Sequence, residues 1–413
     1  MRKISISIIG AGSRGLDAYA NYVFERPELL EVVAVAEPRE AYRNEAIRKF
    51  NIPQKNSFES WEEFVKHPKI SDAVIIATQD RMHTAPALAC IGLGYDILLE
   101  KPMAPTPDEC RQIVKEALSK KCILAVGHVL RYTTYFRKLR ELVQSGIIGE
   151  ISGMRHTEGI ADWHYAHSYV RGNWGNEKNS SPILLAKCCH DIDILNYLID
   201  KKCLRVGSFG GRKYFCRANQ PEGAADRCLD CKYQDSCLYS APKFYFKKMD
   251  EGNFKWPVNV VVSEFTKDAM TEALRSGPYG RCVYACDNNV VEEQTLILEY
   301  EGGIFANMSM SAFSVGRRTE IFGTAGEIRS TFDMIEIRRF DEPEPQIIDM
   351  SKINENITGG HGGGDSGLAA DFVEAVISRD PGKLMSGPEV TLESHMVVFA
   401  AEQSRLTRKI VEL

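Results

Sequence analysis

The sequence predicts an α/β protein in which a parallel sheet covered by helices is followed by an α+β region with an open, mainly antiparallel sheet. Three observations lead to this fold class. Strand and helix patterns alternate from residue 1 to about 125, a glycine-rich turn follows the first strand, and strand patterns separated by tight turns fill much of the remaining chain. They predict one domain over residues 1–125 and a second over 126–413.

Short apolar runs mark the expected strands of the first domain. The run at 73–77 is continuously apolar, as expected for a strand that is covered on both faces. Strands are predicted at 4–9, 31–36, 72–77, 96–100 and 122–127, and helices at 13–24, 39–49, 60–66, 82–93 and 107–119. Such a sheet binds ligands beyond the carboxyl ends of its strands.

The turn after the first strand has the pattern G-x-G-x-x-G. The first glycine permits a tight turn, the second lets backbone N–H groups approach a pyrophosphate, and the third allows close helix packing. Glu37 follows the second strand, where a carboxylate can hold a ribose 2′-hydroxyl. The pattern predicts a Rossmann dinucleotide-binding domain, and the alternative is a glycine-rich turn without a ligand. The turn residues expected at the cofactor are Gly10, Gly12, Ser13, Arg14 and Gly15.

Further candidates lie after the third and fourth strands. Cofactor contacts are expected there from Thr78, Gln79, His83, Glu100 and Lys101. Lys101 follows a buried strand at the ligand edge, in a partly desolvated place where a lysine can share or lose a proton. The alternative is a solvated lysine at a strand end. Pro102 permits a cis peptide bond, although trans is the default.

The second domain begins with a helix pattern at 137–145 and a strand pattern at 151–160. Helical spacing follows at 182–199, and strands are predicted at 204–210, 257–263, 290–300, 303–312, 318–322 and 326–331. Helices in the segment 367–413 are candidates to pack back on the first domain. The glycine-rich segment 359–367 is either a flexible loop with Asp365 or Ser366 as helix cap, or a loop that lets its backbone or His361 approach a substrate.

The order of these features resembles the Gfo/Idh/MocA oxidoreductases, a family that includes glucose–fructose oxidoreductase and inositol dehydrogenase. The resemblance rests on segments 10–15, 77–83 and 138–151, on Glu100-Lys101-Pro102, and on His190-Asp191-Ile192-Asp193. It implies NAD or NADP as cofactor and oxidation of a sugar or polyol hydroxyl. It also implies that His190 is the base for the alcohol proton and that Lys101 polarises the substrate oxygen.

The chain departs from this family next to His190. Many relatives carry an acidic residue four positions earlier, where this chain has Ala186, followed by Lys187. Lys187 is therefore a candidate for a cationic substrate contact or for lowering the pKa of the histidine. For the aromatic and polar residues at 163–174, packing in a core or interface is the alternative to substrate contact. The residues expected at the substrate are Arg131, Tyr132, His164, Arg171, Lys187 and His361.

Four cysteines with the spacing C-x11-C-x2-C-x5-C lie in an insertion at 212–245. Tetrahedral thiolate coordination explains such a cluster in a reducing compartment, and a structural Zn²⁺ would order a segment with little apolar periodicity. A [4Fe–4S] cluster is a less favoured alternative, and four unligated thiols are another. The expected ligands are Cys216, Cys228, Cys231 and Cys237, whereas Cys282 and Cys286 are expected to be packing residues.

Composition limits the possible partners and location. A net charge of −5 argues against nucleic acid and anionic membranes, and no apolar run reaches the roughly eighteen residues that a membrane helix needs. The N-terminus lacks a signal-peptide pattern, so a cytoplasmic location is expected. The open sheet indicates a partner, and the resemblance implies a homodimer or homotetramer.

By this resemblance, the expected activity is that of an NAD-dependent dehydrogenase for a sugar, glycoside or polyol. Glu37 favours NAD because a carboxylate repels a 2′-phosphate, while Arg39 leaves NADP open. One alternative is a glycoside hydrolase that recycles NAD through oxidation, elimination and reduction, with a second base among His164, Tyr165 and His361. The other is a dinucleotide-binding sensor without catalysis.

Overall fold

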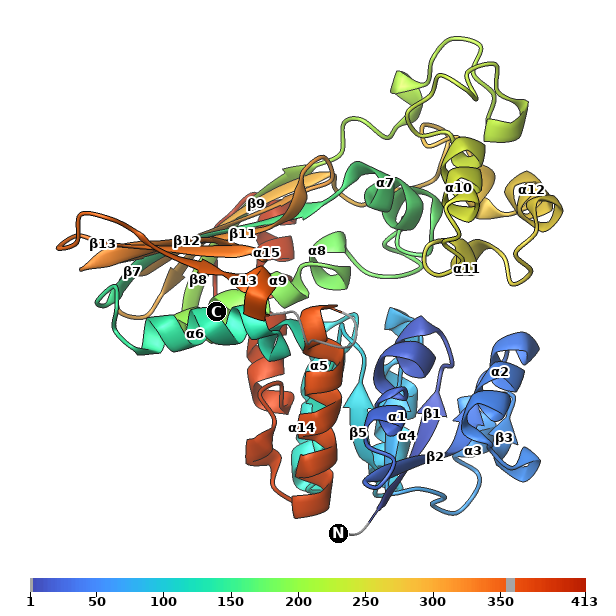
Figure 1. Cartoon of the computed structure of the whole chain (residues 1–413), viewed down its shortest axis with the longest axis horizontal. Coiled ribbons are helices and arrows are strands. Elements are labelled where there is room, and N and C mark those ends of the chain that lie inside the picture. The colour runs from blue at the N-terminus through green and yellow to red at the C-terminus, as the bar shows by residue number, and fades with distance from the viewer. Residues whose placement is uncertain (1–2, 354–360) are drawn as a thin grey trace.

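The computed structural model describes residues 3–353 and 361–413 and contains two sheets. Figure 1 shows the N-terminal elements, in blue, below the second sheet and its helices. The first sheet is parallel throughout, with the order β3-β2-β1-β4-β5-β6, which confirms the predicted Rossmann fold. Its strands are β1 (Ile4–Ile9), β2 (Leu30–Ala36), β3 (Ser57–Phe58), β4 (Ala73–Ile76), β5 (Asp96–Leu99) and β6 (Leu124–Val126).

The helices of this part follow the predicted alternation with one interruption. In place of one helix at 13–24, a π-helix η1 (Ser13–Tyr19) precedes a short α1 (Tyr22–Glu25), and π-turns often occur at functional sites. The α5 helix begins as predicted, because Thr106 accepts a hydrogen bond from the Glu109 N–H and Pro107 occupies the first turn. The helices are α2 (Glu40–Phe50), α3 (Trp61–Phe64), α4 (Thr84–Gly92) and α5 (Pro107–Ser119).

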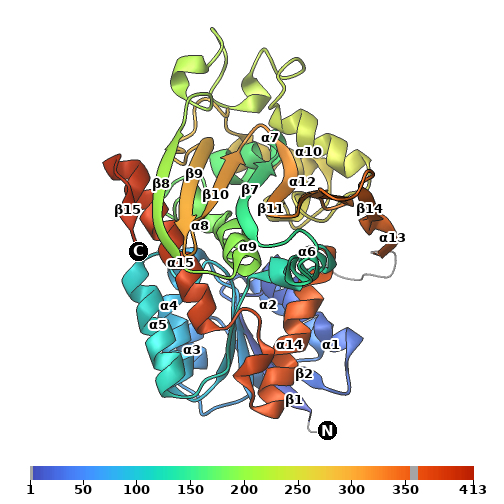
Figure 2. The ribbon, with the colours of Figure 1, turned by 90° about the vertical axis from the view of Figure 1, so that its left-hand side faces the viewer.

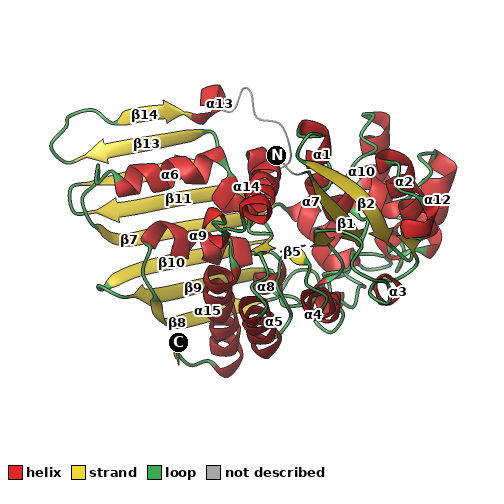
Figure 3. Ribbon diagram, turned by 90° about the horizontal axis from the view of Figure 1, so that it is seen from below, coloured by secondary structure: helices red, strands yellow, loops and turns green. Residues whose placement is uncertain are grey.

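The second sheet is open and mainly antiparallel, as predicted. Its order is β14-β13-β12-β11-β7-β10-β9-β8-β15, and the β10–β7 pair is parallel. Figure 3 shows these strands in a row, with helices against one face. The strands are β7 (Ile151–Ile160), β8 (Cys203–Gly211), β9 (Glu293–Tyr300), β10 (Ile304–Ser311), β11 (Val315–Gly323), β12 (Gly326–Thr331), β13 (Met334–Arg339), β14 (Gln346–Asp349) and β15 (Val411–Glu412).

One face of the second sheet packs on helices and the other is open. Side chains alternate along β9, where Leu296 and Leu298 are buried and Ile297 is 55% exposed. The buried face shares an apolar cluster with the helices that cover it. These are α6 (Thr134–Gln144), α8 (Ile183–Ala186), α9 (Cys189–Ile199) and α15 (Pro388–Thr407), so the predicted helix at 182–199 is divided in two.

A helical group replaces the strand predicted at 257–263. The segment forms α11 (Val258–Val261), and Val258 is buried in a separate apolar cluster with α10 (Ala241–Asp250) and α12 (Lys267–Ser276). Burial against these helices outweighs the strand propensity of the valine-rich run. Figure 1 shows this group beside the short α7 (Asp162–Tyr165).

The C-terminal helices lie against the Rossmann part, as Figure 2 shows. Leu368 and Phe372 of α14 (Gly364–Ser378) share an apolar cluster with Ile6 and Tyr132. The boundary near residue 125 stays a prediction. Of the glycine-rich segment 359–367, residues 359 and 360 lie outside the described part, and the short α13 (Met350–Ile353) precedes it. None of the described helices is long and apolar enough to cross a membrane.

Candidate active site

The glycine turn between β1 and η1 is shaped to accept an anionic group. Gly10 has a φ of +90°, and a Cβ there would lie 2.6 Å from the Ala77 carbonyl oxygen. A Cβ on Gly15 would lie 2.2 Å from the Gly10 oxygen, so neither position admits a side chain. At Gly12, by contrast, an added Cβ would have room, since its nearest neighbour would be Arg39 Nη2 at 3.8 Å. The backbone is therefore open to a pyrophosphate at the position that the sequence predicts.

The Glu37 carboxylate lies beside this turn and is held by Arg39. Glu37 accepts a hydrogen bond from the Ala11 N–H at 2.8 Å, and Arg39 Nε and Nη2 donate to it at 2.7 and 3.0 Å. Burial raises the pKa of Glu37, but the hydrogen bonds from Arg39 and the backbone outweigh burial and lower it. The carboxylate is thus ionised at neutral pH. The turn and Glu37 together fit a dinucleotide such as NAD.

Arg14 joins the turn to two carboxylates instead of facing open space. Its guanidinium pairs with Glu100, contacts the Tyr19 hydroxyl at 2.6 Å and pairs with Asp365 at 2.9 Å. Asp365 lies in the first turn of α14, so this cluster fastens that helix to the nucleotide-binding turn. Ser13, by contrast, is exposed at the start of η1. Cofactor contact by these side chains stays a prediction, and the contacts of Arg14 favour a supporting role.

The segment after β4 is tied to the segment after β5 by His83. The His83 ring lies 2.7 Å from the Pro102 oxygen through Nδ1 and 3.2 Å from the Thr78 oxygen through Nε2. The Thr78 hydroxyl donates to the Met82 carbonyl, while Gln79 is exposed. These contacts shape the carboxyl edge of the sheet where the cofactor residues were predicted.

Lys101 and His190 meet where the two parts of the chain join. Lys101 follows β5, and its Nζ donates a hydrogen bond of 2.7 Å to the Ala186 carbonyl, at the end of α8. His190 lies in the first turn of α9 and is 6% exposed. Its Nδ1 has no hydrogen-bond partner among the described residues, and its ring lies 5.6 Å from the ring of His128. The peptide bond between Lys101 and Pro102 is cis.

His190 has the electrostatic properties of a base. Burial lowers the pKa of His190 well below its usual value, and the positive charge of Lys101 lowers it further. The N-terminal position in α9 acts in the same direction, because the helix dipole disfavours a cation there. The imidazole is therefore neutral at neutral pH and can accept a proton.

A buried ion pair between Arg131 and Asp193 holds α9 in place. Arg131 Nε and Nη2 donate to Asp193 at 2.6 and 2.8 Å, and Ser394 adds a hydrogen bond of 2.8 Å to the same carboxylate. The Tyr132 hydroxyl accepts from the N–H groups of Met385 and Ser386, both at 3.1 Å. Arg131 and Tyr132 were predicted to contact substrate. Their contacts favour instead a role in fixing the junction that carries His190.

A second charged network surrounds Lys187, and the sequence did not indicate it. Lys187 Nζ lies 3.2 Å from Glu158, and Arg317 lies 3.0 Å from Glu158 and 2.7 Å from Asp191. His156 Nε2 also contacts Asp191, at 2.9 Å. The partners come from β7, β11 and α9, which explains why sequence spacing gave no signal. Lys187, three positions before His190, is therefore a cation held in a fixed place.

His164 lies near this centre within an aromatic group. Its ring is 4.9 Å from Trp256, 5.6 Å from Trp163 and 5.9 Å from Tyr169. Burial, and then the charge of Lys187, lowers the pKa of His164 to about 3. Trp256 comes from the segment before α11, so the helical group contributes to the aromatic group around His164. His361 Nδ1 lies 3.2 Å from the Asp365 carboxylate. After burial and Lys101, the charge of His361 is one of the smaller causes that lower the pKa of His190.

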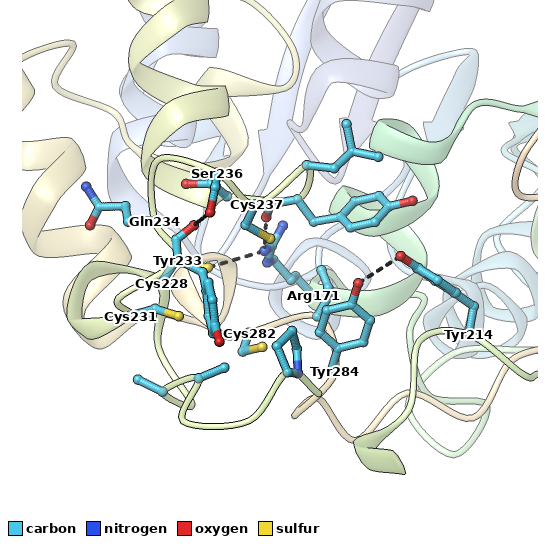
Figure 4. Close-up of a pocket in the computed structure, with 17 residues that line it drawn as sticks. Arg171, Tyr214, Cys228, Cys231, Tyr233, Gln234, Ser236, Cys237, Cys282 and Tyr284 are labelled. Atoms are coloured by element: carbon cyan, nitrogen blue, oxygen red, sulfur yellow. Dashed lines mark hydrogen bonds between the residues drawn. The ribbon is translucent and has the colours of Figure 1, made fainter. Parts of the chain in front are cut away.

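Arg171 does not join the other predicted substrate residues. It is buried, and its guanidinium donates to the carbonyls of Arg281 and Tyr239 at 2.7 and 2.6 Å and to the Cys228 sulfur at 3.5 Å. Figure 4 shows it on the wall of a cavity of about 300 Å³ beside the cysteine-rich segment. The prediction that Arg171 contacts the substrate therefore finds no support in its position.

The four cysteines predicted as metal ligands are not assembled. Cys228, Cys231 and Cys237 line the cavity, whereas the Cys216 sulfur lies outside it and donates to the Lys213 carbonyl at 3.2 Å. No three His, Cys, Asp or Glu side chains within 3–353 and 361–413 are placed to hold a metal ion. The predicted zinc or iron–sulfur site of these four residues is therefore not supported.

Sequence and structure comparisons agree with this architecture. Over residues 136–226 the chain matches a family model described as the GFO/IDH/MocA C-terminal domain. It is 23% identical to the oxidoreductase YteT of Bacillus subtilis over 79% of this chain and 76% of that protein. It is 28% identical to inositol 2-dehydrogenase/D-chiro-inositol 3-dehydrogenase of Lacticaseibacillus casei over 48% of this chain, and the match spans about half (53%) of that protein.

Solved structures share the fold along the whole chain. Levoglucosan dehydrogenase in complex with NADH and levoglucosan has a TM-score of 0.72 at 17% identity, with 100% of this chain and 99% of that chain covered. Aldose–aldose oxidoreductase from Caulobacter crescentus gives a TM-score of 0.68 at 16% identity, with both chains fully covered. Residues 4–128 match a family model described as the oxidoreductase family with an NAD-binding Rossmann fold. The chain therefore belongs to the Gfo/Idh/MocA family of oxidoreductases.

Proposed function

We propose that this chain is an NAD-dependent dehydrogenase that oxidises a CH–OH group of a sugar, glycoside or polyol. The observation that carries the proposal is the meeting of Lys101 with the segment that bears His190, through the 2.7 Å hydrogen bond to Ala186. This junction lies at the carboxyl edge of the parallel sheet, where α/β proteins bind ligands. Relatives named for inositol and levoglucosan oxidation support the substrate class.

In the proposed reaction, the substrate loses a hydride from carbon and a proton from its hydroxyl, and a C=O bond forms. Bound NAD would supply the hydride acceptor. His190 takes the hydroxyl proton, since its lowered pKa keeps the imidazole neutral. Lys101 donates a hydrogen bond to the same oxygen in exchange for its bond to Ala186. Lys187, held by Glu158, offers a second cationic contact to a hydroxyl or carboxylate of the substrate.

Glu37 supports NAD as the preferred cofactor. Its ionised carboxylate lies beside the glycine turn, where it would accept hydrogen bonds from ribose hydroxyls and repel a 2′-phosphate. Arg39 is 54% exposed in its side chain and is free to turn outward when a ribose arrives. NADP would require the reverse arrangement, with Arg39 facing the phosphate.

A glycoside hydrolase that recycles NAD is the second candidate. His164 is the observation that favours it, because its ring, packed against Trp256 and Trp163, places a second imidazole near Lys187 as a candidate base for the proton next to a new carbonyl. A relative named 2,7-anhydro-N-acetylneuraminate hydratase, 24% identical over 48% of this chain, supports chemistry other than net oxidation in the family.

A second copy of the chain is the proposed partner of the open sheet face. Phe209, Ile297 and Phe305 point outward from β8, β9 and β10 and are 74%, 55% and 53% exposed. Neighbouring apolar side chains on one sheet face are typical of an interface. We expect a homodimer or a homotetramer built on this face.

The test is NADH formation across sugars, glycosides and inositols, beside Lys101→Met and His190→Asn. Turnover that both variants lose supports the dehydrogenase. Aglycone release without net NADH supports the hydrolase instead. NAD binding without any turnover on the panel supports the sensor and contradicts both, while a failure to bind NAD contradicts the assignment of the glycine turn.

A further inference from the structure

A cavity outside the proposed active site is lined by four thiols. It lies between the cysteine-rich segment and the residues that lead into β9 and has a volume of about 300 Å³. Its lining includes Cys228, Cys231, Cys237 and Cys282, which Figure 4 shows around Tyr233. Three of these thiols belong to the set predicted from the sequence, and the fourth is one that the sequence assigned to packing.

The backbone brings Cys282 to this place. Arg227 and Arg281 form an antiparallel β-bridge, and the Cys282 N–H donates to the Asp226 carbonyl at 2.8 Å. Cys228 and Cys282 each follow one residue of the bridged pair, so their side chains leave on the side opposite to the arginines. The bridge between Arg227 and Arg281 closes a loop of 54 positions.

The other two thiols are held by a compact turn. The Cys231 N–H donates to the Cys228 carbonyl at 3.3 Å, and the Cys237 N–H donates to the Tyr233 carbonyl at 2.8 Å. All three of these cysteines line the cavity. This spacing of two close cysteines followed by distant ones is common in structural zinc sites.

Arg171 gives an independent indication of negative charge in the cavity. Its side chain is buried, and its hydrogen bonds in the described part of the chain go to two carbonyl oxygens and to the Cys228 sulfur at 3.5 Å. No carboxylate takes part in these bonds. A buried cation without an anionic partner is costly, and thiolates beside it would remove that cost.

We propose that this cavity binds a zinc ion through Cys228, Cys231, Cys237 and Cys282. The sulfurs are not gathered around a single point, and rotation of the cysteine side chains between staggered positions brings them together when the ion enters. Each thiol loses its proton on binding, and Arg171 offsets part of the charge of the resulting tetrathiolate. Cys216 and Cys286 are not ligands. The ion joins the insertion to the strand region and stabilises the fold without taking part in hydride transfer.

The test compares the metal content of serine variants of the full-length protein, purified under reducing conditions without chelator. Elemental analysis is expected to give about one zinc per chain in the unmodified protein and in Cys216→Ser and Cys286→Ser. Cys282→Ser and Cys228→Ser are expected to lose the zinc. A zinc-free unmodified protein overturns the proposal. Zinc that persists in Cys282→Ser but not in Cys216→Ser overturns the ligand set, and stoichiometric iron with sulfide overturns the metal.

Differential alkylation of the unmodified protein keeps the test valid if a variant fails to fold. The four proposed ligands are expected to resist iodoacetamide until a mercurial displaces the zinc, whereas Cys216 reacts before and after. Peptide mapping that finds Cys282 reactive from the start, with Cys216 protected, contradicts the proposal. Neither measurement depends on dehydrogenase activity, so its outcome is separate from that of the proposed function.

Discussion

The Lys101 ammonium donates a hydrogen bond of 2.7 Å to the Ala186 carbonyl and so links the end of β5 to the segment before α9. Burial lowers the pKa of His190, and the positive charge of the nearby Lys101 lowers it further. The lysine is therefore the proposed donor to the substrate and also a charged neighbour of His190, the proposed base.

Lys101→Met is expected to lower kcat by about two to four orders of magnitude, because the substrate oxygen loses its charged donor. NAD binding, measured by quenching of tryptophan fluorescence, is expected to change little. Lys120→Met, on an exposed lysine, is the matched control. Full activity in Lys101→Met would remove Lys101 from the mechanism.

The acid limb of the pH dependence of kcat/KM is expected to lie below pH 6.5, the usual pKa of histidine. His190 acts in its neutral form, and its pKa is lowered by burial and by Lys101, so activity persists as the pH falls through 6.5. In Lys101→Met, the residual activity should show the limb at higher pH, since one of the lowering charges is gone. An acid limb above pH 6.5 in the unmodified enzyme would argue against His190.

Glu37→Ala is expected to raise the KM for NAD about tenfold and to reduce the preference for NAD over NADP, because the ribose loses its carboxylate partner. Arg39→Ala is the comparison. It removes the partner of Glu37 but not the ribose contact, so the KM for NAD should stay within a few-fold. Initial rates with both cofactors measure the ratio, and an unchanged ratio in Glu37→Ala would refute this role.

Asp193→Asn is expected to lower the free energy of unfolding by about 3–5 kcal/mol, since the buried guanidinium of Arg131 would keep its charge without a partner. Both side chains are almost fully buried, which leaves water little access. Asp341→Asn, in an exposed pair with Arg339, is the control and should change stability by less than about 1 kcal/mol. Urea denaturation followed by circular dichroism gives both values.

Phe305→Asp is expected to convert the oligomer to smaller species by placing a charge on the open face of the second sheet. Phe340→Asp is the control, because Phe340 is 67% exposed but follows β13 at the far end of the sheet. Light scattering after size-exclusion chromatography measures the mass of each. An unmodified protein that elutes as a monomer would contradict the proposed interface.

The sequence predicted the Rossmann part closely because its signals are local. The strand at 4–9 agrees with β1 residue by residue, and the glycines at 10 and 15 occupy positions where no side chain fits. The open sheet followed from alternation and tight turns. The strand predicted at 257–263 was wrong, because the valine-rich run is buried between helices that the local pattern does not reveal.

The predicted centre of the site, Lys101 and His190, lies in one region of the structure, although the roles of these residues stay predictions, and the contacts that support the centre were not predicted. Lys101 and His190 carry local signals, a strand end and a family motif. The partner of Arg131 is Asp193 and that of Lys187 is Glu158, so neither arginine nor lysine could be placed without the tertiary fold. The position of Arg171 at the cysteine-lined cavity also depends on residues distant in the sequence, Arg281 and Tyr239, and could not be predicted locally. Spacing alone likewise could not show that Cys216 lies outside the cavity that Cys228, Cys231 and Cys237 line.

The pairing of Arg14 with Asp365, 351 positions later, bears on how the chain folds as it is made. Leu368 and Phe372 complete the apolar cluster that Ile6 belongs to, so the nucleotide-binding core remains unfinished until these two residues have left the ribosome. Nascent chains that stall earlier would expose this core to chaperones and proteases. Cofactor binding at the glycine turn is therefore expected only after α14 has been made.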